Sequence, residues 1–155
     1  MFGDQVEVSV YNPPVDYDFY ASPTGVEVRN NSSLALRFVY GESSYLLAGD
    51  LYSGGEARLV ETYGDALQSD VVKMNHHGYE ANNTLDWVRA VKPLVAVATL
   101  MKDGSKEMVY QSVGADSYFL YKSGHVAIST PGDGTYKVIT ELGENQVTNY
   151  PKAAG

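Results

Sequence analysis

Short apolar segments alternate with segments of helical spacing along the middle of the chain, and this alternation constrains the fold most. Residues 44–48, 70–74 and 94–100 are short and largely apolar, so each predicts a strand. Segment 94–100 is apolar on both faces, which is typical of a strand buried inside a sheet. Strands that alternate with helices predict a layered fold whose strands end at a shared edge, where open sheets bind ligands.

Two helices are expected between these strands. Ser53 and Glu56 have the spacing of a capping box, so the first helix is predicted to begin near Ser53. The second helix is expected over residues 84–91, with Asn83 or Thr84 as its N-cap. These helices would cover the sheet and complete its layers.

The remaining segments predict mostly antiparallel strands within one domain spanning residues 1–155. Valine alternates with polar residues from position 6 to position 10, which indicates a strand with one face in water. Residues 34–40 and 44–48, separated by a short turn, predict a hairpin. The other expected segments are a short helix near 106–112, a meander of strands 117–121, 125–130 and 135–141, and a flexible tail over 143–155.

The composition excludes several classes of site and partner. The 155 residues include three histidines and no cysteine, so a metal would have to be held by His, Asp or Glu. A formal net charge of −8 does not favour nucleic acid as a partner. The sequence contains no apolar run approaching the ~20 residues that span a bilayer, and no recognisable signal peptide. We therefore expect no membrane partner, and the compartment stays open.

Two motifs stand where predicted strands end, Gly49-Asp50 and His76-His77-Gly78. A carboxylate and an imidazole at one sheet edge suit a divalent cation. Adjacent side chains on extended backbone point to opposite sides, so one histidine would reach the metal. The other would orient a substrate oxyanion or support the ligand. As ordinary alternatives, Gly-Asp is a common turn, and adjacent histidines also occur as caps or hydrogen-bonded residues. His125 is expected to be a half-buried strand residue.

The motifs and the segments around them resemble a known family. The stretches NNSSLALRFVYGESSYLLAGDL and SDVVKMNHHGYEANNTLDWVRAVKPLVAVAT are similar to the second half of the metallo-β-lactamase fold. The resemblance is greatest to the hydrolase domain of competence-type (ComEC-like) proteins. It covers residues 30–141 and rests on the order and spacing of the motifs.

The resemblance implies a fold and a metal site. The fold would be α+β with α/β-type layers: the C-terminal half of the αβ/βα sandwich, with a mixed sheet and about two to three helices. Asp50 would be the carboxylate that bridges two metals, and the histidine pair would supply an imidazole ligand. We assign the ligand to His77 and the substrate-facing, catalytic role to His76, with the reverse assignment as the alternative. The cofactor would be one or two Zn²⁺ ions, or Mn²⁺.

The chain also departs from the family pattern. The family's first half carries a His-x-His-x-Asp-His motif, whereas this sequence contains no histidine before Asp50. Because a catalytic zinc site uses three protein ligands, we expect this chain alone to hold no metal tightly and to be inactive.

Two functions follow from the resemblance. The first is the C-terminal portion of a hydrolase that cleaves a small phosphodiester or ester with metal-activated water. The alternative is a non-catalytic interaction module derived from the same fold. The missing half of the fold would leave an apolar sheet face, so the expected partners are that half or a second copy of this chain.

Overall fold

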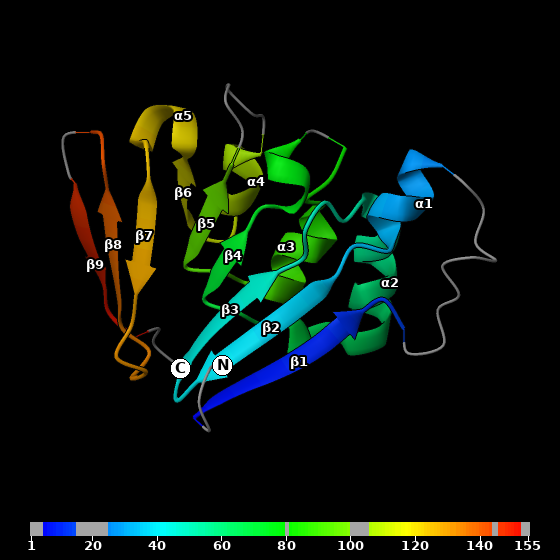
Figure 1. The fold of residues 1–155 in the computed structure, drawn as a ribbon, viewed down its shortest axis with the longest axis horizontal. Coiled ribbons are helices and arrows are strands. Elements are labelled where there is room, and N and C mark those ends of the chain that lie inside the picture. Colours follow the sequence, from blue (N-terminus) through cyan, green and yellow to red (C-terminus); the bar gives the residue numbers. More distant parts are fainter. Residues whose placement is uncertain (1–4, 15–24, 80, 100–105, 144–145, 153–155) are drawn as a thin grey trace.

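Two β-sheets and a layer of helices make up the fold. The computed structural model describes residues 5–14, 25–79, 81–99, 106–143 and 146–152. The first sheet contains, in spatial order, β1 (Val6–Asn12), β2 (Ala35–Tyr40), β3 (Ser43–Leu47), β4 (Val71–Lys73), β5 (Val95–Ala98) and β6 (Asp116–Phe119). The second contains β7 (Val126–Ser129), β8 (Tyr136–Thr140) and β9 (Val147–Tyr150). Figure 1 shows the smaller sheet beside the β4–β6 side of the larger one.

The larger sheet is mixed. Strands β1, β2 and β3 pair antiparallel, and β3, β4, β5 and β6 pair parallel. The parallel connections pass through helices, as parallel strands require. The helices are α1 (Val26–Asn31), α2 (Ser53–Tyr63), α3 (Leu85–Val91), α4 (Glu107–Gln111) and α5 (Leu120–Ser123), with short 3₁₀ helices at Gly64–Leu67 and Asn75–Gly78. The expected α/β-type layers and mixed sheet are confirmed.

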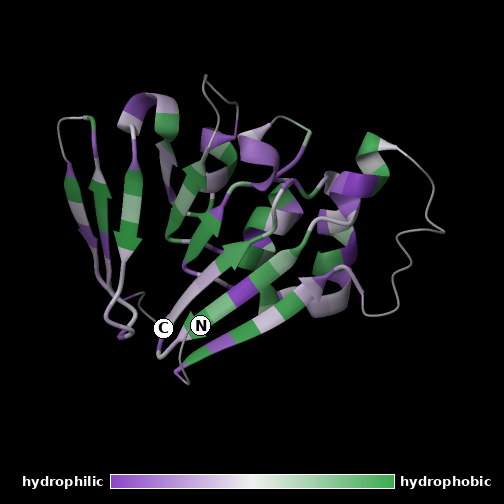
Figure 2. Ribbon diagram, viewed as in Figure 1, coloured by the Kyte–Doolittle hydropathy of each residue, from purple (hydrophilic) through white to green (hydrophobic). Residues whose placement is uncertain are grey.

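The two faces of the parallel strands are buried in different cores. Val72 and Ala96 face the helices and pack with Trp87 of α3. The alternate residues Val71 and Val95 face the smaller sheet. Burial on both faces explains why these strands are almost wholly apolar in the sequence. Figure 2 shows the contrast with β1, along which hydrophobic and hydrophilic residues alternate.

Several expectations about elements are wrong. The segment expected as the first meander strand instead forms β6, which pairs parallel with β5 at the edge of the larger sheet. The meander is completed by β9, within the segment expected to be a flexible tail. The described part of the chain holds five α-helices where two or three were expected. Helix α4 agrees with the short helix expected near 106–112. The helices that were not expected, α1 and α5, have six and four residues, too short for a clear periodic pattern.

The capping-box prediction is also wrong. Tyr52 is the N-cap of α2, and its side chain makes no capping hydrogen bond. Glu56 does not turn back toward the start of the helix, because its carboxylate is buried and accepts hydrogen bonds from a distant loop. The cap of α3 agrees with one of the two expected residues: Thr84 Oγ1 accepts a hydrogen bond from the backbone N–H of Trp87. No helix in the described ranges is both long enough and apolar enough to cross a membrane.

Candidate functional site

Asp50 lies just beyond the end of β3. Gly49 turns the chain there with a φ of +58°, which favours glycine. A Cβ at Gly49 would lie 3.3 Å from Cβ of Ser33, so glycine also allows a close approach. The backbone N–H of Asp50 donates to Ser33 Oγ at 3.2 Å. These contacts hold the backbone of Asp50 at the edge of the sheet.

The histidine pair lies beyond the end of β4, on strained backbone. His76 and His77 have φ values of 47° and 61°, in the left-handed region that is costly for residues other than glycine. The expectation of extended backbone at this pair is therefore wrong. The backbone N–H of His76 donates to the carbonyl of Gly49 at 3.1 Å, which joins the two loops directly. Gly78 follows, where a Cβ would meet Ala98 Cβ at 3.2 Å.

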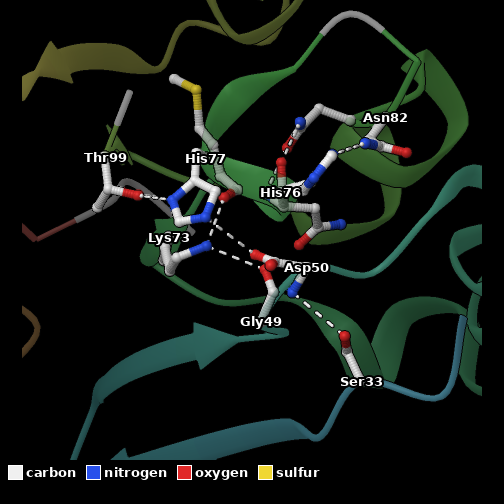
Figure 3. Close-up of polar contacts among 11 residues, drawn as sticks. Ser33, Gly49, Asp50, Lys73, His76, His77, Asn82 and Thr99 are labelled. Carbon is white, nitrogen blue, oxygen red and sulfur yellow. Dashed lines mark hydrogen bonds and ion pairs between the residues drawn. The ribbon is translucent and has the colours of Figure 1, made fainter. Parts of the chain in front are cut away.

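The structure brings His77 and Asp50 together and directs His76 elsewhere. His77 Nε2 lies 3.4 Å from Asp50 Oδ1, and both side chains are about two-fifths exposed. The other ring nitrogen, Nδ1, lies 2.6 Å from Thr99 Oγ1 just beyond β5. Figure 3 shows His77 pointing toward Asp50 and His76 pointing toward Asn82. The edge formed by β3, β4 and β5 therefore carries one carboxylate–imidazole pair.

His76 occupies a polar and aromatic environment. Its Nδ1 accepts a hydrogen bond from Asn82 Nδ2 at 3.1 Å. Its ring stacks against Tyr79 at a centroid distance of 4.8 Å and lies 4.9 Å from the ring of Tyr52. If the neutral imidazole accepts at Nδ1, its proton lies on Nε2. That nitrogen is then a hydrogen-bond donor and has no free lone pair for a metal.

Sequence reasoning missed Lys73, the last residue of β4. Its Nζ donates to the carbonyls of Gly49 and Met74 at 2.9 and 3.0 Å. Burial lowers the pKa of this amine, and the charge of Asp50 opposes that decrease. The lysine thus brings a positive charge beside the carboxylate and links the two loops. Its place at the end of the strand, at the same edge as Asp50, was the available signal.

His125 lies in a different part of the molecule. It precedes β7 in the smaller sheet, where its Nδ1 pairs with Glu141 Oε2 at 2.7 Å. Its side chain is 93% exposed, so the expectation of a half-buried residue is wrong. His125 therefore contributes nothing to the Asp50–His77 pair.

The site offers two potential metal ligands. Within the described ranges, no three His, Asp or Glu side chains form a group that could hold a metal ion. A carboxylate and an imidazole are suitable donors for zinc or manganese, but a catalytic zinc needs a third protein ligand. Asp50 and His77 alone therefore cannot complete a catalytic zinc site.

Comparisons with known proteins relate the chain to competence proteins. Over 86 residues, 55% of the chain, it is 36% identical to the competence protein ComA of Neisseria gonorrhoeae. It is 29% identical over 85 residues to ComE operon protein 3 of Bacillus subtilis (strain 168). It is also 25% identical over 105 residues to the uncharacterized protein YcaI of Escherichia coli (strain K12).

The similarity is limited to a small part of each relative. The matched stretches span 12%, 11% and 14% of ComA, ComE operon protein 3 and YcaI, respectively. No family model matches the chain. The comparisons therefore support a relationship to competence proteins over about half of this chain.

Proposed function

We propose that this chain is the C-terminal portion of a metal-dependent hydrolase of the metallo-β-lactamase superfamily. In this proposal Asp50 and His77 are metal ligands and His76 faces the substrate. The observation that carries the proposal is the 3.4 Å approach of His77 Nε2 to Asp50 Oδ1 at adjacent strand ends. The competence-protein relationship adds support, since it matches the branch that the motifs resemble.

The hydrogen bonds support the assignment of roles within the histidine pair. If His77 Nδ1–H donates to Thr99 Oγ1, the lone pair of Nε2 faces Asp50 and is free for a cation. If His76 Nδ1 accepts from Asn82, His76 has the opposite arrangement, with Nε2–H free to donate. A donor at this position suits an oxyanion of the substrate.

The proposed substrates are small phosphodiesters or esters. Divalent ions in such a site would lower the pKa of bound water and stabilise negative charge on the substrate. In this chain, Lys73 and His76 would add two further groups that favour negative charge nearby. No observation favours the non-catalytic module over this proposal.

The third ligand defines the expected behaviour of the isolated chain. Asp50 and His77 supply only two of the donors that a catalytic zinc requires. We therefore expect weak, exchangeable metal binding and no hydrolysis by this chain alone. The further metal ligands would have to come from a partner. The two proposed partners are the other half of the fold and a second copy of the chain.

The metal site can be tested by titrating the chain with Mn²⁺ and recording amide signals by NMR. Paramagnetic broadening should concentrate at Asp50 and His77 and should be lost in Asp50→Asn. The matched control is Asp86→Asn, which removes an exposed carboxylate from α3 and should leave the broadening unchanged. Broadening that is indifferent to Asp50→Asn, or a stoichiometric metal ion retained after dialysis, would contradict the proposal as stated.

The catalytic roles can be separated in a longer protein that contains this chain and the completing ligands. His77→Gln should lower the bound metal content together with hydrolysis of a phosphodiester or ester. His76→Gln should lower kcat while the metal content is unchanged. Equal metal loss in both variants would reverse the assignment, and full activity in both would overturn the proposed function.

A further inference from the structure

A buried carboxylate lies behind the histidine turn. Glu56 is on α2, and its side chain is 0% exposed. Its Oε1 accepts from Asn75 Nδ2 at 2.7 Å and from the backbone N–H of Asn83 at 2.6 Å. Its Oε2 accepts from the backbone N–H of Thr84 at 2.8 Å. All three donors are neutral, and they lie at the two ends of the segment that contains the histidines.

Asn75 and Asn83 also pair with each other. The backbone N–H of Asn75 donates to Asn83 Oδ1 at 2.8 Å, and Asn83 Nδ2 returns a hydrogen bond to the Asn75 carbonyl at 2.9 Å. Tyr110 of α4 adds a third contact, with its hydroxyl donating to Asn83 Oδ1 at 2.8 Å. Glu56, Asn75, Asn83 and Tyr110 are buried, and we refer to them as the loop clasp.

The clasp closes a segment whose backbone is strained. His76, His77 and Asn83 have positive φ values of 47°, 61° and 58°. Residues other than glycine keep such angles only where the surrounding structure imposes them. The clasp holds residues 75 and 83, which flank the histidine turn, and α2 holds the clasp. The strained backbone angles and the buried hydrogen bonds thus belong to the same turn.

We propose that Glu56 is a positioning residue that holds the histidine turn so that the ring of His77 faces Asp50. Glu56 acts through Asn75 and Asn83 and touches neither histidine. This inference rests on the proposed function for the meaning of the His77–Asp50 pair, but its structural content can be tested without metal.

Glu56→Gln is the most direct variant, because it keeps the shape of the side chain. The new amide nitrogen is a donor and must replace an oxygen that now accepts from N–H groups, so at least one contact becomes repulsive. We expect the backbone N–H of His76, which bonds to Gly49, to exchange with solvent about tenfold faster or more. We also expect the balance between the two tautomers of the His77 ring to change, as read from its ¹H–¹⁵N NMR pattern.

Two controls separate local positioning from a general loss of stability. Val138→Ala removes buried apolar contact from β8 and lowers overall stability at a distance from the turn. It should leave the His77 ring pattern unchanged. Glu61→Gln makes the same chemical change at an exposed position of α2 and should alter neither measurement.

Tyr110→Phe provides a second, milder test, because it removes only the hydroxyl that donates to Asn83. It should move the exchange of the His76 amide and the His77 pattern in the same direction as Glu56→Gln, by a smaller amount. A normal His77 pattern in folded Glu56→Gln, or in Tyr110→Phe if the first variant does not fold, would overturn the inference. Such a result would leave the metal proposal intact, whereas absence of Mn²⁺ broadening at Asp50 would contradict the metal proposal alone.

Discussion

Lys73 carries a positive charge to the edge of the sheet although burial lowers its pKa. Its ammonium donates to two carbonyls, and those of Gly49 and Met74 belong to the loops that carry Asp50 and the histidines. A partly buried cation such as Lys73 is tolerated when its donors are satisfied and an opposite charge is near. The lysine is therefore part of what holds these two loops together.

Replacing Lys73 with Met should destabilise the protein. The substitution keeps an unbranched side chain and leaves the Gly49 and Met74 carbonyls without their charged donor. We expect a loss of about 1–3 kcal/mol in the free energy of unfolding, measured by urea denaturation. Lys137→Met makes the same change at an exposed position of β8 and should be close to neutral. Equal effects of the two substitutions would show that the Lys73 contacts contribute nothing specific.

The sequence located the candidate residues but not the contacts that orient them. Strand ends in the pattern were sufficient to select Asp50 and the histidine pair. The role of Glu56 was hidden because its partners, Asn75 and Thr84, are 19 and 28 residues away. The spacing of Ser53 and Glu56 therefore led to a local interpretation of Glu56, as part of a capping box. The left-handed backbone of the histidines was equally hidden, because only the folded surroundings impose it.

At the level of elements, the two long helices begin in different ways. Helix α3 has a side-chain cap from Thr84, while the capping hydrogen bond expected for α2 is absent. The structure instead attaches α2 to the rest of the fold through Gly55 and Glu56. The backbone N–H of Gly55 donates to Asn31 Oδ1 at 2.7 Å, and the carboxylate of the next residue, Glu56, is buried.

Alanine substitutions at the two helix starts should therefore differ. Thr84→Ala removes the acceptor for the Trp87 N–H and should cost about 1 kcal/mol. Ser53→Ala removes no cap, and it should change stability by about 0.5 kcal/mol at most. Thermal or urea unfolding of both variants checks the difference. A loss at Ser53 as large as that at Thr84 would restore the capping-box interpretation.

The smaller sheet has an acid-sensitive contact at one end, between His125 just before β7 and Glu141 just after β8. The backbone N–H and ring of His125 hold the pKa of Glu141 below its ordinary value. The ionised carboxylate therefore favours the folded state above the unfolded pKa of about 4.3, and this contribution is lost as pH falls through the folded pKa. The effect should be confined to the acid range.

Glu141→Gln tests this acid sensitivity. Wild type should be more stable than the variant near neutral pH, and the two should converge at about pH 3 and below. Urea midpoints measured across this range report the difference. Glu61→Gln, at an exposed position of α2, should keep a constant offset from wild type. A pH-independent offset for Glu141→Gln would exclude the proposed charge contribution.

Strand existence was more predictable than strand partnership. The pattern of apolar residues indicated β3, β4 and β5 correctly, since burial on both faces leaves a continuous apolar segment. The pattern could not assign β6 to a sheet, because that assignment depends on the pairing of β6 with β5, from which helix α4 separates it in the sequence. Strand β9 is polar and half-exposed, so its residues carry little signal of the pairing with β8.

The whole molecule has three layers over part of its area and two over the rest. The smaller sheet covers the outer face of the parallel strands, while β1 and β2 extend beyond it (Figure 1). Val8 and Val10 of β1 lie opposite Phe38 and Leu36, on the face turned away from the helices. Val8 is 41% and Val10 is 59% exposed. An apolar cavity of about 500 Å³ adjoins this face, beside Tyr45 of β3.

We expect this apolar face to be covered by a second copy of the chain. A contiguous apolar surface of this kind favours association, because burying it removes nonpolar area from water. The isolated chain should therefore self-associate as its concentration rises, which sedimentation or light scattering can measure. Val8→Lys should shift the equilibrium toward monomer, since a charge on this face would have to be desolvated in the complex.

The opposite face provides the control. Glu7→Lys introduces the same side chain at the neighbouring, exposed position of β1, and alternation directs it to the other side of the sheet. Association that weakens with Val8→Lys and persists with Glu7→Lys would place the contact on the outer face. Equal weakening would show that the outer face is not the specific contact, and net charge could not explain it, because a less negative chain repels its copies less. A monomer at high concentration would contradict self-association through this face.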